Sequence, residues 1–167
     1  MSTNFAACVI LYNPKKDDIN NISTYANKVK KVYVFDNTEG NSNESFFKGI
    51  ENVSYFWDNE NKGISIRLNE ACQKAIEENF EYLMTMDQDS SFCEKNIDCY
   101  FNDILNFKVK EKVAVYGLEY SIKDINDKTP TYSEVEHLIT SASVLNLKLY
   151  TEIGRSEERR VGKECRL

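Results

Sequence analysis

The sequence predicts an α/β domain built on an open, mostly parallel sheet with helices on both faces. Apolar runs of strand length alternate along the chain with segments in which apolar residues recur every three or four positions. This alternation is typical of helices that cover a parallel sheet. The chain has 167 residues, 41% of them hydrophobic, which is enough to bury one core but not two sizeable ones. We therefore expect one domain.

The first third of the chain carries alternating strand and helix patterns. In order, the expected elements are a strand at 5–12, a weak helix at 17–27, a strand at 31–35, a short helix at 45–49 and a strand at 53–57. The first strand reads FAACVILY, a continuous apolar run that is typical of a strand covered on both faces. Asn13 and Pro14 end it.

The clearest helix pattern follows a polar turn at 58–63. Apolar residues recur at three- and four-residue spacing from Ile64 to Phe80, and charged residues fall on the other side. The remaining expected elements are a strand at 82–86, a helix at 97–105, a strand at 113–118, a polar, turn-like stretch at 120–131 and one or two strands within 136–147. We expect His137 in one of these last strands, without a functional role.

The charge balance and the cysteines exclude several classes of protein. Lys and Arg number 21 against 27 Asp and Glu, and no basic stripe with interleaved aromatics occurs, so nucleic-acid binding is not expected. The five cysteines form no Cys-x-x-Cys pair and the chain has one His, which argues for reduced thiols rather than a zinc site. No apolar run is long enough for a membrane span or a signal peptide. We expect a cytoplasmic protein.

The last 13 residues differ in composition from the rest of the chain. Four of the five arginines lie within 155–167, and this stretch is mostly charged with no apolar period. It resembles a translated cloning or sequencing adaptor. We expect residues 1–154 to form the domain, incomplete at its C-terminus, and 155–167 to be a non-native tail; the alternative is a native, solvated helix.

Polar residues follow the expected strands at their carboxyl ends. They are Asn13, Asp36, Asn37, Asn61 and the group at 87–90. In open parallel sheets the ligand lies beyond the carboxyl ends of the strands, so we expect these residues to converge on one rim. Asp87 and Asp89 can both offer oxygen ligands to a hard cation such as Mg or Mn. The alternative for this pair is a solvated loop or a helix cap.

The sequence lacks the motifs of several common α/β enzymes. The turn after the first strand has none of the glycines of a dinucleotide site, and no phosphate-binding loop with Gly-Lys-Ser/Thr occurs. A serine nucleophile elbow is also missing.

Four motifs occur in a fixed order along the chain. They read VILYNP at 9–14, VFDN at 34–37, NKGI at 61–64 with Asn69, and MDQDS at 86–90. With these motifs, residues 5 to about 154 resemble the family 2 glycosyltransferases, specifically the bacterial rhamnosyltransferase-like group. The resemblance implies a GT-A fold, a Rossmann-like, mostly parallel sheet with helices on both faces.

The same resemblance implies an activity. An enzyme of this group takes a sugar, rhamnose among the candidates, from a dTDP- or UDP-linked donor. It passes the sugar with inversion to a hydroxyl of a glycan or lipid-linked glycan, in surface polysaccharide synthesis. Peripheral membrane association of the parent enzyme is compatible with such an acceptor.

The resemblance also implies roles for single residues. The residues that would bind the nucleotide sugar are Leu11, Tyr12, Asn13, Asp36, Asn37, Asn61, Gly63, Ile64, Asn69, Asp87 and Gln88. The backbone at 11–13 and the Asp36 carboxylate would hold the nucleobase and ribose, and Asp89, with Asp87, would hold Mg or Mn on the diphosphate. The start of a helix at Gly63 offers free N–H groups that suit a phosphate or sugar oxygen.

The sequence departs from the group in two places. Ser141 would lie on the acceptor side, but Ala142 stands where the group has glycine. After Gly154 the sequence Arg-Ser-Glu-Glu replaces the expected segment, and the candidate general base of the group belongs to the part that is missing. The catalytic residue therefore stays unknown, with Glu157 the nearest stand-in by position, and we expect transfer activity to be lost or weak in this chain.

The sequence is also compatible with two other functions. One is a phosphatase of the haloacid dehalogenase type with Asp87 as nucleophile, although that motif usually opens its fold and here follows three strands. The other is a non-catalytic nucleotide-sugar-binding module of the same fold.

Overall fold

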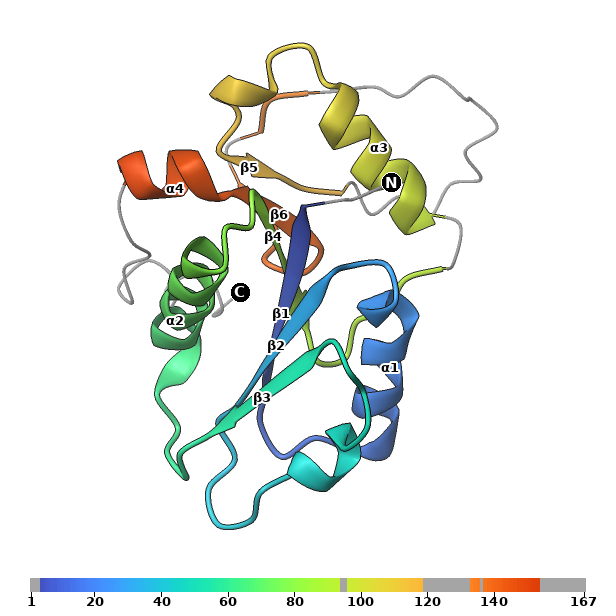
Figure 1. Ribbon diagram of the computed structural model, residues 1–167, viewed down its shortest axis with the longest axis vertical. Coiled ribbons are helices and arrows are strands. Elements are labelled where there is room, and N and C mark those ends of the chain that lie inside the picture. Colours follow the sequence, from blue (N-terminus) through green and yellow to red (C-terminus); the bar gives the residue numbers. More distant parts are fainter. Residues whose placement is uncertain (1–3, 94–95, 119–132, 136, 154–167) are drawn as a thin grey trace.

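The computed structural model describes residues 4–93, 96–118, 133–135 and 137–153 (Figure 1). In this part of the chain six strands form one sheet in the order β3-β2-β1-β4-β6-β5. The strands are β1 Phe5–Leu11, β2 Lys31–Asp36, β3 Val53–Trp57, β4 Tyr82–Asp87, β5 Val115–Tyr116 and β6 Ser143–Asn146. The helices are α1 Lys16–Ala26, α2 Gly63–Glu77, α3 Asn96–Asn106 and α4 Leu147–Ile153, with short 3-10 turns η1 Glu44–Phe47 and η2 Lys110–Lys112.

The sheet is parallel from β3 to β4 and changes direction at β6. Strand β1 pairs in parallel with β2 and with β4, and β2 pairs in parallel with β3. Strand β6 runs antiparallel to both of its neighbours, β4 and β5. The predicted α/β architecture with a mostly parallel sheet is therefore confirmed.

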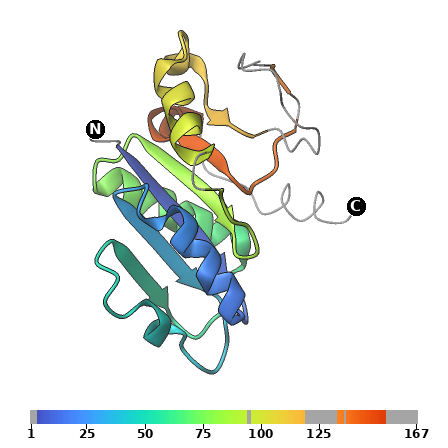
Figure 2. The ribbon, with the colours of Figure 1, turned by 90° about the vertical axis from the view of Figure 1, so that its right-hand side faces the viewer.

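The helices cover both faces of the sheet, as predicted. Figure 1 shows α1 and α2 on opposite sides of the strands, and Figure 2 gives the same arrangement from the side. One buried cluster joins residues of α1 and α3 to the sheet, and a second joins residues of α2 and the first residue of α4. The two layers explain why the strands are apolar on both faces.

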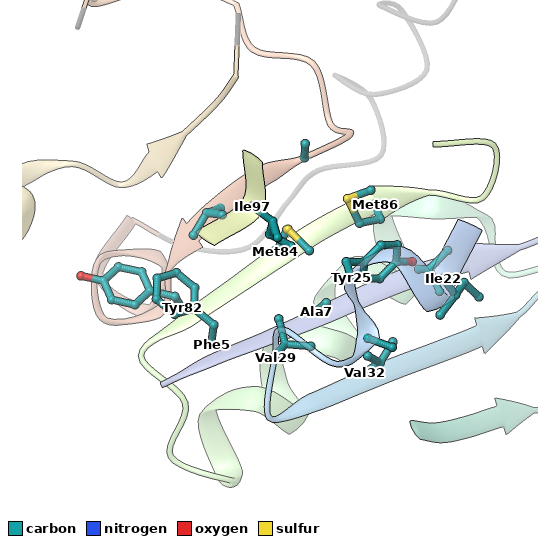
Figure 3. Packing of buried hydrophobic residues seen from close by; sticks show 14 of the residues in the cluster. Phe5, Ala7, Ile22, Tyr25, Val29, Val32, Tyr82, Met84, Met86 and Ile97 are labelled. Carbon is teal, nitrogen blue, oxygen red and sulfur yellow. The ribbon is translucent and has the colours of Figure 1, made fainter. Parts of the chain in front are cut away.

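Strand β1 shows how one sequence serves two cores. Alternate side chains point to opposite faces of a strand, so Phe5 and Ala7 pack toward α1 and α3 (Figure 3), whereas Ala6 and Cys8 pack toward α2. The Phe5 ring stacks on the rings of Tyr82 and Phe101, with centroids 4.8 and 4.2 Å away. The continuous apolar run of the sequence follows from this double burial.

Helix α2 ends earlier than its apolar period predicts. Asn79 has φ +61°, its N–H bonds the Ile76 carbonyl at 3.0 Å, and the N–H of Phe80 bonds the Ala75 carbonyl at 2.9 Å. This pair of bonds with a left-handed residue is a Schellman motif. Phe80 continues the apolar pattern because the motif folds it back against the core, where it packs with the α2 cluster.

The last third of the chain corrects several expected boundaries. The strand expected at 113–118 is reduced to Val115–Tyr116, and within 136–147 only 143–146 is a strand among the described residues. His137 lies outside any strand and Leu147 begins α4. The stretch at 120–131 and the expected tail at 155–167 lie outside the described residues. Of the helices in the described part, none is both long and apolar enough to cross a bilayer.

Candidate functional site

The register of the parallel strands brings the predicted rim residues to one edge of the sheet. Asp36 at the end of β2 pairs with Leu11 of β1 and with Trp57 of β3, and Asp87 at the end of β4 pairs with Ile10 of β1. Neighbouring strands lie about 4.8 Å apart, so the backbones of Asp36 and Asp87 are roughly 10 Å apart across β1. This carboxyl edge of the sheet is the candidate site.

The loop that carries the two aspartates is fastened to the loop after β1. The Gln88 side chain accepts a hydrogen bond from the Tyr12 N–H at 2.8 Å and donates one to the Tyr12 carbonyl at 3.3 Å. From α1, the Asn21 side chain donates to the Gln88 carbonyl at 3.1 Å. Gln88 therefore uses its amide on the protein backbone, and its predicted contact with a nucleotide sugar stays a prediction.

Asp87 and Asp89 are exposed at this edge. Partial burial and the neighbouring charge of Asp89 both raise the pKa of Asp87 above its ordinary value. The Asp87 N–H donates to the hydroxyl of Ser141 at 3.3 Å, which ties the end of β4 to the turn before β6. Ser141 itself is buried, and its place facing an acceptor stays a prediction.

Two carboxylates are a partial ligand set for a metal ion. Within the described ranges, no group of three or more His, Cys, Asp and Glu side chains could hold a metal ion by itself. An ion held by Asp87 and Asp89 would therefore need further oxygen ligands from a bound phosphate or from water.

Asp36 lies at the same carboxyl edge of the sheet, but its side chain is fully buried. Its Oδ1 accepts a hydrogen bond from the Thr38 N–H at 2.8 Å. Its Oδ2 accepts bonds from the Tyr55 hydroxyl at 2.6 Å and from the Asn43 side chain at 2.8 Å. Burial and the bond to Asp36 raise the pKa of Tyr55 to about 12. The carboxylate thus holds the loop after β2, and a contact between Asp36 and a nucleobase stays a prediction.

Asn37 links the end of β2 to the start of α2. Its N–H bonds the Leu11 carbonyl at 2.8 Å and its Nδ2 donates to the Gly63 carbonyl at 3.3 Å. Gly63 has φ +76°, a left-handed conformation that glycine adopts without strain, and its N–H bonds the Asn61 side chain at 3.0 Å. The structure therefore brings Asn37, Asn61 and Gly63 together.

The other predicted residues lie around this network. Leu11 is buried, Tyr12 and Ile64 are exposed, and the Asn13 N–H donates to the Thr38 hydroxyl at 2.8 Å. Asn69 instead points toward α4, where its Oδ1 accepts a bond from the Tyr150 hydroxyl at 2.5 Å.

Arg67 is the residue of this edge that the sequence motifs did not single out. It is 2% exposed, and its guanidinium makes five hydrogen bonds to Asn37, Asp58, Glu60 and Glu70. One sequence signal could have found it: Arg67 is four residues before Ala71 in the helix pattern, so a charged residue falls on the inward side of α2.

A hollow at the opposite edge does not belong to this site. A pocket of about 440 Å³ lies at the amino end of β4, where Phe80, Tyr82, Lys110 and Leu147 contribute to its wall. The residues predicted from the strand ends do not line it. The pocket and the predicted rim are therefore separate features of the sheet.

Comparisons with known proteins support the fold. No protein-family model matches the sequence, and no curated protein matches it. The chain is similar to the crystal structure of S. aureus TarS 1-349, with TM-score 0.62 and 15% identity over 89% of this chain and 48% of that one. It is also similar to the structure of S. aureus TarS, with TM-score 0.57 and 14% identity over 89% of this chain and 29% of that one.

The likeness to TarS supports a glycosyltransferase-like fold. The predicted GT-A architecture is thereby confirmed for this chain. The chain spans about half the length of the first of these structures.

Proposed function

We propose that this chain is the nucleotide-sugar-binding part of an inverting glycosyltransferase. It would bind a nucleoside-diphosphate sugar, dTDP- or UDP-linked, at the carboxyl edge of β1, β2 and β4, for transfer to a glycan or lipid-linked glycan. A family 2, rhamnosyltransferase-like enzyme of surface polysaccharide synthesis, working in the cytoplasm, is the finer form of the proposal.

One observation carries the proposal. On a GT-A fold, the exposed Asp87–Asp89 loop lies at the carboxyl edge of the sheet, beside the loops after β1 and β2. Ligands of open α/β sheets bind at this edge. The nucleobase and ribose would lie against the backbone at 11–13, next to the loop that Asp36 holds.

The side chains present fit a bound magnesium or manganese ion. Mg is typically held in proteins by one or two carboxylates, with substrate phosphates and water completing its shell, and the exposed pair Asp89 and Asp87 matches that donor set. Such an ion supplies a positive charge that neutralises the departing diphosphate. We assign no general base in this chain.

Calorimetry with nucleoside diphosphates tests the proposal. The wild-type chain should bind UDP or dTDP more tightly with Mn than without it, because the ion would join Asp89 to the diphosphate. Asp89→Asn, which keeps the shape but removes a charge, should abolish most of the Mn-dependent gain. The matched control is Asp98→Asn, since Asp98 is an exposed aspartate on α3 that pairs with Lys28.

Four outcomes would contradict the proposal in different ways. Absence of nucleotide binding by the wild-type chain would refute the binding function itself. Binding that Mn does not change, or equal losses in Asp89→Asn and Asp98→Asn, would refute the metal role of Asp89. A covalent aspartyl phosphate at Asp87 after exposure to a phosphate monoester would instead favour the phosphatase alternative.

A further inference from the structure

We propose that Arg67 is a positioning residue for the donor edge of the site. In this proposal its guanidinium fixes the Asn37 side chain, which in turn holds the Gly63 carbonyl at the first turn of α2. The inference rests on the proposed function of that edge, because it assigns Arg67 an effect on nucleotide binding without direct contact.

The bonds of Arg67 reach four residues in three segments of the chain. Nε donates to Asn37 Oδ1 at 2.7 Å. One terminal nitrogen donates to Asp58 at 3.2 Å and to Glu70 at 2.9 Å, and the other donates to Asp58 at 2.5 Å and to the Glu60 carbonyl at 3.1 Å. Arginine has five N–H donors in a fixed plane, so its hydrogen-bonding capacity is used in full.

The contact with Asn37 determines how that side chain is oriented. Oδ1 accepts from Arg67, which has no acceptor to offer, so Nδ2 must face the Gly63 carbonyl, 3.3 Å away. Asn37 is 3% exposed and its N–H bonds the Leu11 carbonyl. Asn37 thus connects Arg67 to the end of β1 through its backbone N–H and to the start of α2 through its side-chain amide.

The charge of Arg67 is compensated within the protein. Asp58 and Glu70 both accept hydrogen bonds from it, and Lys62 also forms an ion pair with Asp58. The Arg67 side chain is buried, whereas the side chains of Asp58 and Glu70 are 37% and 36% exposed. Partly exposed ion pairs add little net stability, but the five hydrogen bonds fix the position of the guanidinium. Arg67 therefore acts through where it places Asn37 and the 58–62 loop, and not as an attractive charge for the diphosphate.

Lysine cannot replace arginine in this arrangement. Its ammonium is a single point with three donors, and cannot reach Asn37, Asp58, Glu60 and Glu70 together. Arg67→Lys consequently keeps the charge and removes the positioning. Arg67→Met keeps much of the length of the side chain and removes both the charge and the positioning.

The test measures binding of UDP and dTDP, with Mn, by calorimetry at a temperature where circular dichroism shows each variant folded. Arg67→Lys and Arg67→Met should weaken binding by about tenfold or more, as expected when a binding group is displaced. Asn37→Ala should have a similar effect, and the double variant Arg67→Met, Asn37→Ala should be no weaker than either single one, because the two residues act as a unit. The matched control is Lys74→Met, which removes another α2 cation, 4.3 Å from the Phe56 ring centroid, and should leave affinity within about twofold.

A second readout does not depend on nucleotide. In ¹H–¹⁵N spectra, Arg67→Lys should shift the side-chain amide of Asn37 and the backbone amide of Gly63 and speed their exchange with solvent, whereas Lys74→Met should not. If the wild-type chain binds no nucleotide, the proposed function fails while this readout still decides the positioning claim. Unchanged Asn37 and Gly63 signals, unchanged affinity in folded Arg67→Lys, or additive losses in the double variant would each overturn the inference. If Arg67→Met does not fold, Arg67→Lys and Asn37→Ala decide the outcome.

Discussion

Replacing Tyr25 with phenylalanine should stabilise the protein. Tyr25 is fully buried on α1, and within the described part of the chain its hydroxyl has no hydrogen-bond partner. Its ring packs among apolar side chains such as Ile22 and Met86 (Figure 3). Burial also raises the pKa of Tyr25 well above its ordinary value, which favours the neutral hydroxyl.

The magnitude follows from the two terms that the substitution changes. A buried hydroxyl without a partner costs about 1–3 kcal/mol in mutational series. Removing the oxygen recovers that cost but leaves a small void, whose lining loses some contacts. We expect a net gain of about 1 kcal/mol, which for a chain of this length raises Tm by roughly 2–4 °C.

Tyr55→Phe is the matched control because it removes the same atom from a different environment. The Tyr55 hydroxyl donates to the buried Asp36 carboxylate at 2.6 Å and accepts from the Asn43 N–H at 2.9 Å. Loss of a hydrogen bond to a charged group costs about 1.5–3 kcal/mol. The two substitutions should therefore change the free energy of unfolding in opposite directions.

Urea unfolding followed by circular dichroism measures both changes. The midpoint should rise for Tyr25→Phe and fall for Tyr55→Phe, with the slope m unchanged in each case. A lower midpoint for Tyr25→Phe would refute the reasoning, since it would show that the hydroxyl makes a favourable bond, for instance to a buried water.

Three further predictions concern acid, alkali and backbone strain. Hydrogen bonds from Arg67 hold the pKa of Asp58 well below its usual range. The stability that this ion pair contributes should therefore be full above about pH 4 and be lost at lower pH. Between about pH 5 and pH 2, the urea midpoint should fall less in Asp58→Asn than in the wild-type chain. Burial raises the pKa of Tyr116 to about 12, above an ordinary value of about 10, so stability should decline as pH rises between about 10 and 12, and less so in Tyr116→Phe. Ala142 is buried and has φ +58°. In thermal unfolding, Ala142→Gly should change the free energy of unfolding by no more than about 1 kcal/mol, because relief of backbone strain offsets the lost methyl group. Ala142→Val should lower the free energy of unfolding by at least about 2 kcal/mol.

The parallel half of the fold could be predicted because each element there is long enough to show its period. Strands β1 and β4 have seven and six residues, and α2 has fifteen. Strand β5 has two residues and β6 four, which is too short for a period to be read. The place of β6 in the sheet is set by pairing with β4, far away in the sequence, and β5 in turn pairs with β6.

The sequence predicts which edge of the sheet carries the candidate site, but not the hydrogen-bond network that connects its residues. Strand ends are visible in the sequence, and they placed Asp36 and Asp87 at one edge, as the register confirms. The face on which a side chain lies depends on the strand alternation: Asp36 follows Val32 and Val34 toward the α1 side, where Tyr55 encloses it. Glu70 lies three residues after Arg67 on α2, but Asn37, Asp58 and Glu60 come from outside this helix, and no local spacing marks these three partners.

The antiparallel placement of β6 has a consequence for the order in which the chain assembles. Pairing of β1 with β2 and of β2 with β3 joins neighbours in the sequence, whereas β6 must pass α3 and η2 before it meets β4, pairing Asn146 with Tyr82. Closing a longer loop costs more chain entropy and slows contact formation. The unit from β1 to β4 can therefore collapse first, and until β6 arrives the outer side of β4 is an open strand edge. Newly made chains are then most prone to aggregate in the interval between completion of β4 and docking of β6.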